Sequence, residues 1–219
     1  MSVRGPKPLL GERPVDRIYE AALACIDQRG FRKTSMDDIA REAGVSRPTV
    51  YTYFGSKKDV VLEVIVRPAA DLLATLGKKV AQRGGLDCVI EAACLGVLAM
   101  FEHPYFRAII VGGEATPWIA EIVVHERFRS VEQDFWRPIL QQAIDLGEVR
   151  ADRDVDEMID WILFQQFALG THGQSFGLTE PAIRELVSTY IARALQPLSP
   201  GEVTASANRC RRGPPGLRS

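Results

Sequence analysis

The sequence predicts an all-α protein of about nine helices, and two observations support this fold class. Apolar residues recur every three or four positions along most of the chain, and glycine or proline separates the periodic stretches. The two-residue alternation that marks half-buried strands is absent, as is any convincing hairpin turn. The composition, with 46% hydrophobic and 25% charged residues, is ordinary for a folded globular protein.

The helices follow from the periodic stretches and from the residues that end them. A first helix is expected over residues 14–29, because Gly30 follows its last apolar residue. Two short helices come next, and a long one over 56–82 contains Pro68, which should kink or divide it. Further helices are expected over 86–102, 105–111, 116–146 and 154–172, with a last one beginning near Pro181.

Residues 34–58 predict two short helices joined by a tight turn. Thr34 is expected to cap the first helix, with Asp37 as the carboxylate of its capping box. Gly44 stands where a left-handed turn residue is required. Ser46 can cap the second helix.

Three residues give this pair of helices the character of a helix-turn-helix unit. Ala40 is the small residue that a close helix crossing needs, Gly44 makes the turn, and Val50 returns as the branched apolar contact. Phe54, four residues after Val50, faces the same interior. Because such units place their second helix in the major groove, the sequence predicts binding to double-stranded DNA.

The charge distribution agrees with a DNA-binding N-terminus, although the net charge is only −1. Residues 1–67 carry twelve Lys and Arg against nine Asp and Glu, and residues 197–219 carry four Arg against one Glu. The middle of the chain is therefore acidic. A basic end on an acidic body suits a protein that presents one end to a polyanion.

Other classes of function lack their motifs. The chain contains no GxSxG, HExxH or GxxxxGK[ST] pattern, so we expect no catalytic residues, no cofactor and no enzyme activity. Its four cysteines include no CxxC pair and its three histidines are scattered, so we expect no metal site. No apolar run approaches the length of a membrane span, and we expect a cytoplasmic, nucleoid-associated protein.

Residues 30–64, together with the helix before them, resemble the tetracycline-repressor (TetR) family of bacterial one-component regulators. The resemblance implies a homodimer in which each subunit places residues 47–54 in the major groove. It also implies a repressor that a small-molecule effector releases from a palindromic operator. From the residues themselves, an activator and a corepressor-dependent regulator remain open alternatives. Arg47, Tyr51, Tyr53 and Lys57 argue against a helical binding module without DNA activity.

The resemblance divides the chain into a DNA-binding domain over 13–67 and an effector-binding and dimerisation domain over 68–196. We expect disorder in an N-terminal arm, 1–12, and in a basic tail, 197–219. Arg47 should recognise guanine through its planar guanidinium. Side chains that can contact a base or a phosphate complete the predicted DNA surface: Thr34, Ser46, Arg47, Pro48, Thr49, Tyr51, Thr52, Tyr53 and Lys57.

Two further surfaces are predicted in the second domain. Aromatic and apolar residues of its middle helices are candidates for the lining of a pocket for a largely apolar effector: Phe101, Phe106, Ile110, Trp118, Phe128, Phe135 and Trp161. The helix after Asp154 is apolar nearly all round, which favours packing against a second subunit. The predicted dimer residues are Ile162, Gln166, Leu169, Leu186, Val187, Tyr190 and Ile191.

Overall fold

The computed structural model describes residues 13–102, 121–173 and 175–198, and these residues form an all-α fold without strands. Nine α-helices lie in the described residues, and a π-helical turn, Val187–Ile191, joins the last two. Their bounds are α1 Pro14–Arg29, α2 Met36–Ala43, α3 Arg47–Tyr53, α4 Lys57–Val80, α5 Gly85–Glu102, α8 Glu126–Asp145, α9 Val155–His172, α10 Glu180–Leu186 and α11 Ala192–Leu195.

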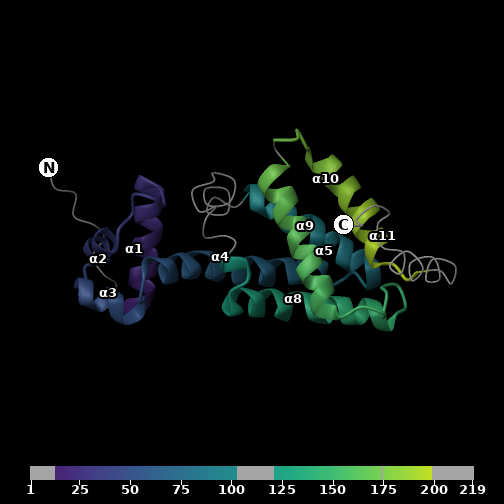
Figure 1. The fold of residues 1–219 in the computed structure, drawn as a ribbon, viewed down its shortest axis with the longest axis horizontal. Helices are drawn as coiled ribbons and strands as arrows, with labels where there is room; N and C mark the ends of the chain where they lie inside the picture. Colours follow the sequence, from purple (N-terminus) through teal and green to yellow (C-terminus); the bar gives the residue numbers. More distant parts are fainter. Residues whose placement is uncertain (1–12, 103–120, 174, 199–219) are drawn as a thin grey trace, which may run out of the picture.

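Helix α4 connects the two ends of an elongated molecule (Figure 1). Helices α1, α2 and α3 gather at its N-terminal end and make the part that we call the head. The other end of α4 packs against α5 and α8, and α9 packs in turn against α5 and α8. The last helical segment, from α10 to α11, lies along α5 on the far side of this body.

Two apolar cores hold this arrangement together. The first core is built around Ile18, Val50 and Val64, and it continues along α4 to Ile122 and Phe128 beside the body. The second core lies wholly in the body and joins α5, α8, α9 and the last helical segment. The first core therefore spans the predicted boundary between residues 67 and 68, and α4 crosses that boundary without interruption.

The structure corrects one predicted helix and refines two others. The single helix expected over 116–146 is interrupted at Val124 and His125, and the His125 imidazole caps the new start of α8 by accepting from the Arg127 N–H. Pro68 is buried inside α4 and does not divide it. The last predicted helix forms but contains the π-helical turn.

Several predicted features lie outside the described residues. These are the arm over 1–12, the short helix over 105–111 and the tail from residue 199 onward. Among the helices that are described, none combines the length and the apolar character that crossing a membrane requires.

Candidate DNA-binding and effector sites

The first helix of the helix-turn-helix unit begins one residue later than predicted. Ser35, not Thr34, is its N-cap: Ser35 Oγ accepts from the Asp38 N–H, and Asp38 accepts from the Ser35 N–H. The Ser35 hydroxyl and the Ser35 N–H both donate to the Asp38 carboxylate and, together with Arg29, lower the pKa of Asp38 to about 2. Thr34 is buried at 3% exposure, and its hydroxyl donates to the Gly30 carbonyl. The capping and phosphate-contact roles predicted for Thr34 are therefore wrong.

The turn between α2 and α3 has the predicted geometry and an additional support. Gly44 is left-handed, with φ +63°, and Ser46 caps α3 by accepting from the Thr49 N–H. Arg17 of α1 donates to the carbonyls of Ala43 and Gly44, at 2.6 and 3.3 Å. These two hydrogen bonds hold the first helix against the turn. The sequence of the helix-turn-helix unit itself does not indicate them.

Helix α3 separates scaffold residues from a polar outer face. Val50 and Phe54 are buried, as predicted, and hold the helix against the first core. Thr52 Oγ1 donates to the Pro48 carbonyl, and the hydroxyls of Ser46 and Thr49 lie 2.7 Å apart. The predicted DNA-binding residues that the structure brings together on the exposed or half-exposed face are Ser46, Arg47, Pro48, Thr49, Tyr51, Thr52 and Tyr53.

Arg47 is exposed but already paired within the protein. Its Nε lies 3.2 Å from Asp37 Oδ1, and its guanidinium lies 5.5 Å from the centre of the Tyr51 ring. Tyr51 and Asp37 raise the pKa of Arg47 further above its usual value, so the group is fully charged. Because surface ion pairs contribute little net stability, Arg47 can exchange Asp37 for a base edge at small cost. Asp37 therefore pre-positions the arginine instead of capping α2.

Lys57 does not have the phosphate-contact geometry that the sequence suggests. It begins α4, is partly buried, and its Nζ donates to the carbonyls of Phe31 and Arg32, at 2.8 and 3.3 Å. The ammonium also lies 5.2 Å from the centre of the Phe31 ring, and burial lowers its pKa. Lys57 thus ties the start of α4 to the segment after α1, and we assign it to the scaffold.

The substitution Lys57→Met distinguishes a scaffold role of Lys57 from a phosphate contact. We expect the free energy of unfolding to fall by about 1–2 kcal/mol, because two backbone carbonyls lose a charged donor. The slope of log K for duplex binding against log salt should stay within about half a unit of wild type, whereas loss of a phosphate contact would lower it by about one. Urea denaturation and duplex titrations across salt concentrations measure the two quantities. A lower salt slope with unchanged stability would restore the phosphate role.

A network of charged side chains links the head to the body through α4. Arg67 of α4 donates to Asp16 of α1 at 3.0 Å and pairs with Glu63 one turn earlier. Glu63 in turn accepts from Arg127 of α8 at 2.6 Å. Lys58 pairs with Glu121, so a second contact joins the start of α4 to the segment before α8. These ion pairs therefore connect α8 to α1 through α4.

A small cavity of about 50 Å³ lies between the helices of the body. Helices α4, α5, α8 and α9 all contribute to its wall, which is apolar apart from Glu132, Gln166 and the indole N–H of Trp136. Of the residues predicted for an effector pocket, Phe128 and Phe135 line this cavity. Phe101 and Trp161 pack against the second core and do not line the cavity. Phe106, Ile110 and Trp118 lie outside the described residues.

Glu132 is the unusual residue of this cavity. It is 7% exposed, and burial raises the pKa of its carboxyl to about 7, against the opposing effect of the Trp136 indole. The indole Nε1–H approaches Glu132 but makes no bond of hydrogen-bond geometry with an acceptor. One feature of the sequence indicates this residue: Glu132 interrupts the apolar stripe of α8 between Phe128 and Trp136.

A larger open groove of about 670 Å³ runs beside the cavity between α4 and α8. Leu73 and Phe135 line both hollows, so these two side chains separate the groove from the cavity. A Cβ at Gly77 of α4 would stand 3.9 Å from the Phe135 ring, which is an ordinary contact distance.

Metal-ligating residues do not gather in the part of the chain that the structure describes, where no group of three or more His, Cys, Asp and Glu residues lies close enough to hold an ion. Cys25, Cys88 and Cys94 are free and buried, and burial raises the pKa of each thiol. These thiols are therefore packing residues.

Four of the predicted dimer residues belong to the interior of a single subunit. Ile162, Val187 and Ile191 lie in the second core, and Gln166 is buried with its Nε2 donating to the Ala93 carbonyl at 3.1 Å. These four side chains therefore face the core of their own subunit. The sequence does not show this, because apolar residues that face a core and those that face a second subunit look alike in sequence. Leu169 and Leu186 are half-buried.

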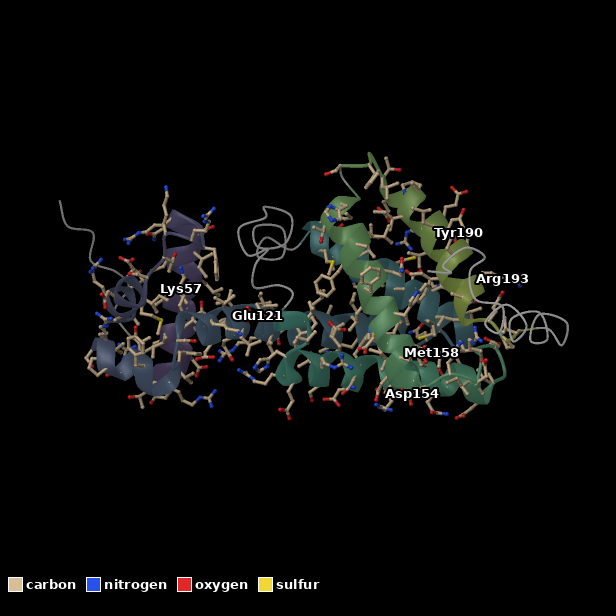
Figure 2. The ribbon with its side chains drawn as sticks, viewed as in Figure 1. Lys57, Glu121, Asp154, Met158, Tyr190 and Arg193 are labelled. Carbon is tan, nitrogen blue, oxygen red and sulfur yellow. The ribbon has the colours of Figure 1, made fainter. Side chains whose placement is uncertain are left out.

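Large exposed apolar side chains mark a different face of the same helices. Phe164 of α9 is 68% exposed, and Tyr190 of the π-helical turn is 67% exposed. Figure 2 labels Tyr190 on the last helical segment, at the end of the molecule opposite to Lys57 and the head. Of the predicted dimer residues, Tyr190 is thus the one whose side chain is exposed. Phe164 was not predicted.

The head and its exposed α3 define a helix-turn-helix DNA-binding protein, and comparisons with known proteins agree. Residues 18–64 match the family model described as bacterial regulatory proteins, tetR family. The regulator BetI of Agrobacterium fabrum is 43% identical over 67 residues, 30% of this chain and 32% of BetI. The repressor KstR2 of Mycobacterium tuberculosis is 27% identical over 146 residues, 64% of this chain and 70% of KstR2.

The fold of the whole described chain agrees as well. A TetR-family transcriptional regulator from Haemophilus influenzae has a similar structure, with a TM-score of 0.55 and 21% identity over 84% of this chain and 99% of that one. The DNA-binding part of this chain, residues 18–64, therefore matches that of the TetR family, and the curated relatives named here are transcriptional regulators. The match to BetI spans less than two thirds of that protein's length, so it relates the DNA-binding parts alone.

Proposed function

We propose that this protein is a homodimeric repressor that a small, largely apolar effector releases from a palindromic operator. The observation that carries the proposal is the exposed face of α3, where Arg47 and Tyr51 stand on a helix fixed by Val50 and Phe54. KstR2, which is similar over most of its length, is named a transcriptional repressor, and this supports repression over activation. In this proposal residues 13–67 bind DNA, and residues 68–196 bind the effector and a second subunit.

The proposed dimer places two heads on one DNA duplex. A palindromic operator presents half-sites about 34–36 Å apart, so one head is insufficient. Phe164 and Tyr190 supply the exposed apolar surface for an isologous interface that involves α9 and the last helical segment. Burial of two such faces by a two-fold axis would form a four-helix arrangement.

The proposed release of DNA is a population shift between two head positions. An effector that enters the cavity lined by Phe128 and Phe135 must move α8 relative to α4, because the cavity of about 50 Å³ is too small for most organic ligands. Arg127 on α8 is tied through Glu63 and Arg67 to Asp16 on α1. Movement of α8 would thus change the separation of the two heads.

Arg47→Ala tests the DNA-binding part of the proposal. A duplex selected from a random library by the full-length protein provides the preferred sequence. We expect Arg47→Ala to lose discrimination between this duplex and random DNA by about 1–3 kcal/mol, because one guanine edge loses its bidentate donor. Competition gel shifts measure the difference.

Asp37→Asn is the matched control, since it frees Arg47 without removing it. We expect it to keep the sequence preference. Selection of no preferred duplex by the wild-type protein would refute sequence-specific binding, and an unchanged preference in Arg47→Ala would refute the role of Arg47.

A further inference from the structure

The cavity of the body combines an apolar wall with one buried acid that has no cationic partner among the described residues. Apart from Glu132, the lining carries no titratable group: α4 contributes Ile65, Ala69, Leu72, Leu73 and Leu76, α5 contributes Ala92, Gly96 and Met100, and α9 contributes Leu163, Gln166 and Phe167. Buried carboxyl groups are costly unless paired or bonded. An acid without a described partner in a cavity suggests that a ligand supplies the partner.

We propose that the effector is an apolar molecule with one positively charged nitrogen, which pairs with Glu132 inside this cavity. This inference rests on the proposed function, and it names the chemical class of the effector. A cation entering the cavity offsets the desolvation of the carboxylate, whereas an anion would face a like charge in an apolar surrounding. A neutral ligand would gain nothing from the charge.

The rest of the wall suits such a cation. The rings of Phe128, Phe135, Trp136 and Phe167 line the same cavity as the acid, and aromatic faces attract positive charge at short range. The Phe135 and Trp136 rings meet edge to face at 5.2 Å between centroids, so they present both an edge and a face. The apolar part of the ligand can pack on the α4 and α5 side chains.

Ionisation of Glu132 would also satisfy the unpaired indole. In the free protein the Trp136 Nε1–H is buried without a bonded acceptor. When the cation binds, Glu132 gives up its proton to solvent, and the resulting carboxylate can accept both from the ligand nitrogen and from the indole N–H. Binding should therefore release protons at a pH where the free acid is protonated.

The open groove between α4 and α8 gives the ligand a way in. Leu73 and Phe135 are shared by the groove and the cavity, and Phe135 is only half-buried. A ligand larger than the cavity can displace the Phe135 ring, bring its charged nitrogen to Glu132, and leave its apolar end in the groove. This route also moves α8 away from α4.

Three probes of similar size and different charge test the proposal: 2-phenylethylamine, 2-phenylethanol and 3-phenylpropanoate. By titration calorimetry at pH 8, we expect the amine to bind wild-type protein at least tenfold more tightly than the alcohol, and the acid most weakly. The affinity of the amine should rise about tenfold between pH 6 and pH 8, because the Glu132 carboxyl, with a pKa of about 7, ionises over this range. At pH 6 binding should release about 0.9 proton, seen in buffers of different ionisation enthalpy.

Two variants complete the experiment. Glu132→Gln should abolish the preference for the amine, the proton release and the pH dependence. Asp134→Asn, which removes an exposed carboxylate of the adjoining groove on the same helix, should keep all three. Loss of the preference in Asp134→Asn instead of Glu132→Gln would place the ligand in the groove and overturn the assignment.

Other outcomes separate the ligand class from the function. Tighter binding of the alcohol or the acid, or no binding of the amine at millimolar concentration, overturns the assignment to cations. If the acid or the alcohol then releases the selected duplex, the proposed repressor function stands with a different effector. If the wild-type protein selects no duplex at all, the proposed function fails independently of these probes.

Discussion

Glu132→Gln is expected to raise the free energy of unfolding by about 3 kcal/mol at pH 8 and to leave it nearly unchanged at pH 4. Glu132 is 7% exposed in an apolar cavity, and burial raises its pKa from 4.5 to about 7. Above pH 7 the wild-type protein must keep an ionised carboxylate in this cavity. Glutamine has the shape of the protonated acid and carries no charge, so it avoids that cost.

The sign of this pH dependence follows from the proton count. Between pH 4.5 and about 7 the folded protein holds a proton on Glu132 that the unfolded chain has lost. Stability from this group is therefore complete below pH 4.5 and decreases as the pH rises through 7, by up to about 1.4 kcal/mol per pH unit. Glu132→Gln should lack this component.

Urea denaturation of both proteins at several pH values between 4 and 8 measures the effect. Asp134→Asn is the control, because it removes an exposed carboxylate two residues away on the same helix and should change stability by no more than about 0.5 kcal/mol. A stability difference between wild type and Glu132→Gln that does not vary with pH would contradict the buried-acid interpretation.

Phe164→Asp is expected to convert the proposed dimer into a monomer at micromolar concentration. Phe164 is 68% exposed on α9, so the change should barely affect the folding of one subunit. In a two-fold interface the same change would bury two unpaired carboxylates, which costs several kcal/mol. The mass in solution should fall from twice 24.3 kDa to 24.3 kDa, and affinity for a palindromic duplex should drop about 10²–10⁴-fold as the second head is lost.

Sedimentation equilibrium and duplex titrations check both results. Val124→Asp is the matched control: Val124 is 65% exposed, in the segment before α8, and it should leave both mass and affinity unchanged. A wild-type protein that is monomeric would refute the dimer itself. A dimer that survives Phe164→Asp would refute its placement on this face.

The head could be predicted from sequence because its determinants are local. Gly44, Ser46 and Val50 take the expected roles, since a turn, a cap and a helix crossing each depend on residues a few positions apart. The error at Thr34 is also local, because the predicted cap lies one residue from the observed one. Both Thr34 and Ser35 can cap a helix, and the bond from the Thr34 hydroxyl to Gly30 decides between them.

The body was less predictable because its features depend on contacts between distant helices. Val187 and Tyr190 lie three residues apart on one helical segment, yet one is fully buried and the other 67% exposed. Periodicity alone could not orient them. Glu132 becomes a cavity residue only because helices from four parts of the chain surround it, and the break before α8 is invisible in the apolar pattern.

The core shared between head and body limits how such a protein can acquire a new DNA specificity by recombination. Ile122 and Phe128 of the body complete an apolar cluster that begins at Ile18. The family-model match ends at residue 64, just before Arg67, which bonds to Asp16 of α1. A segment exchange that ends at residue 64 would import a foreign α1 against a native Arg67 and Phe128. Under the proposed function, we therefore expect heads to be exchanged between relatives most readily when these partner residues are exchanged with them. We also expect single changes on the outer face of α3 to alter DNA specificity without disturbing this packing.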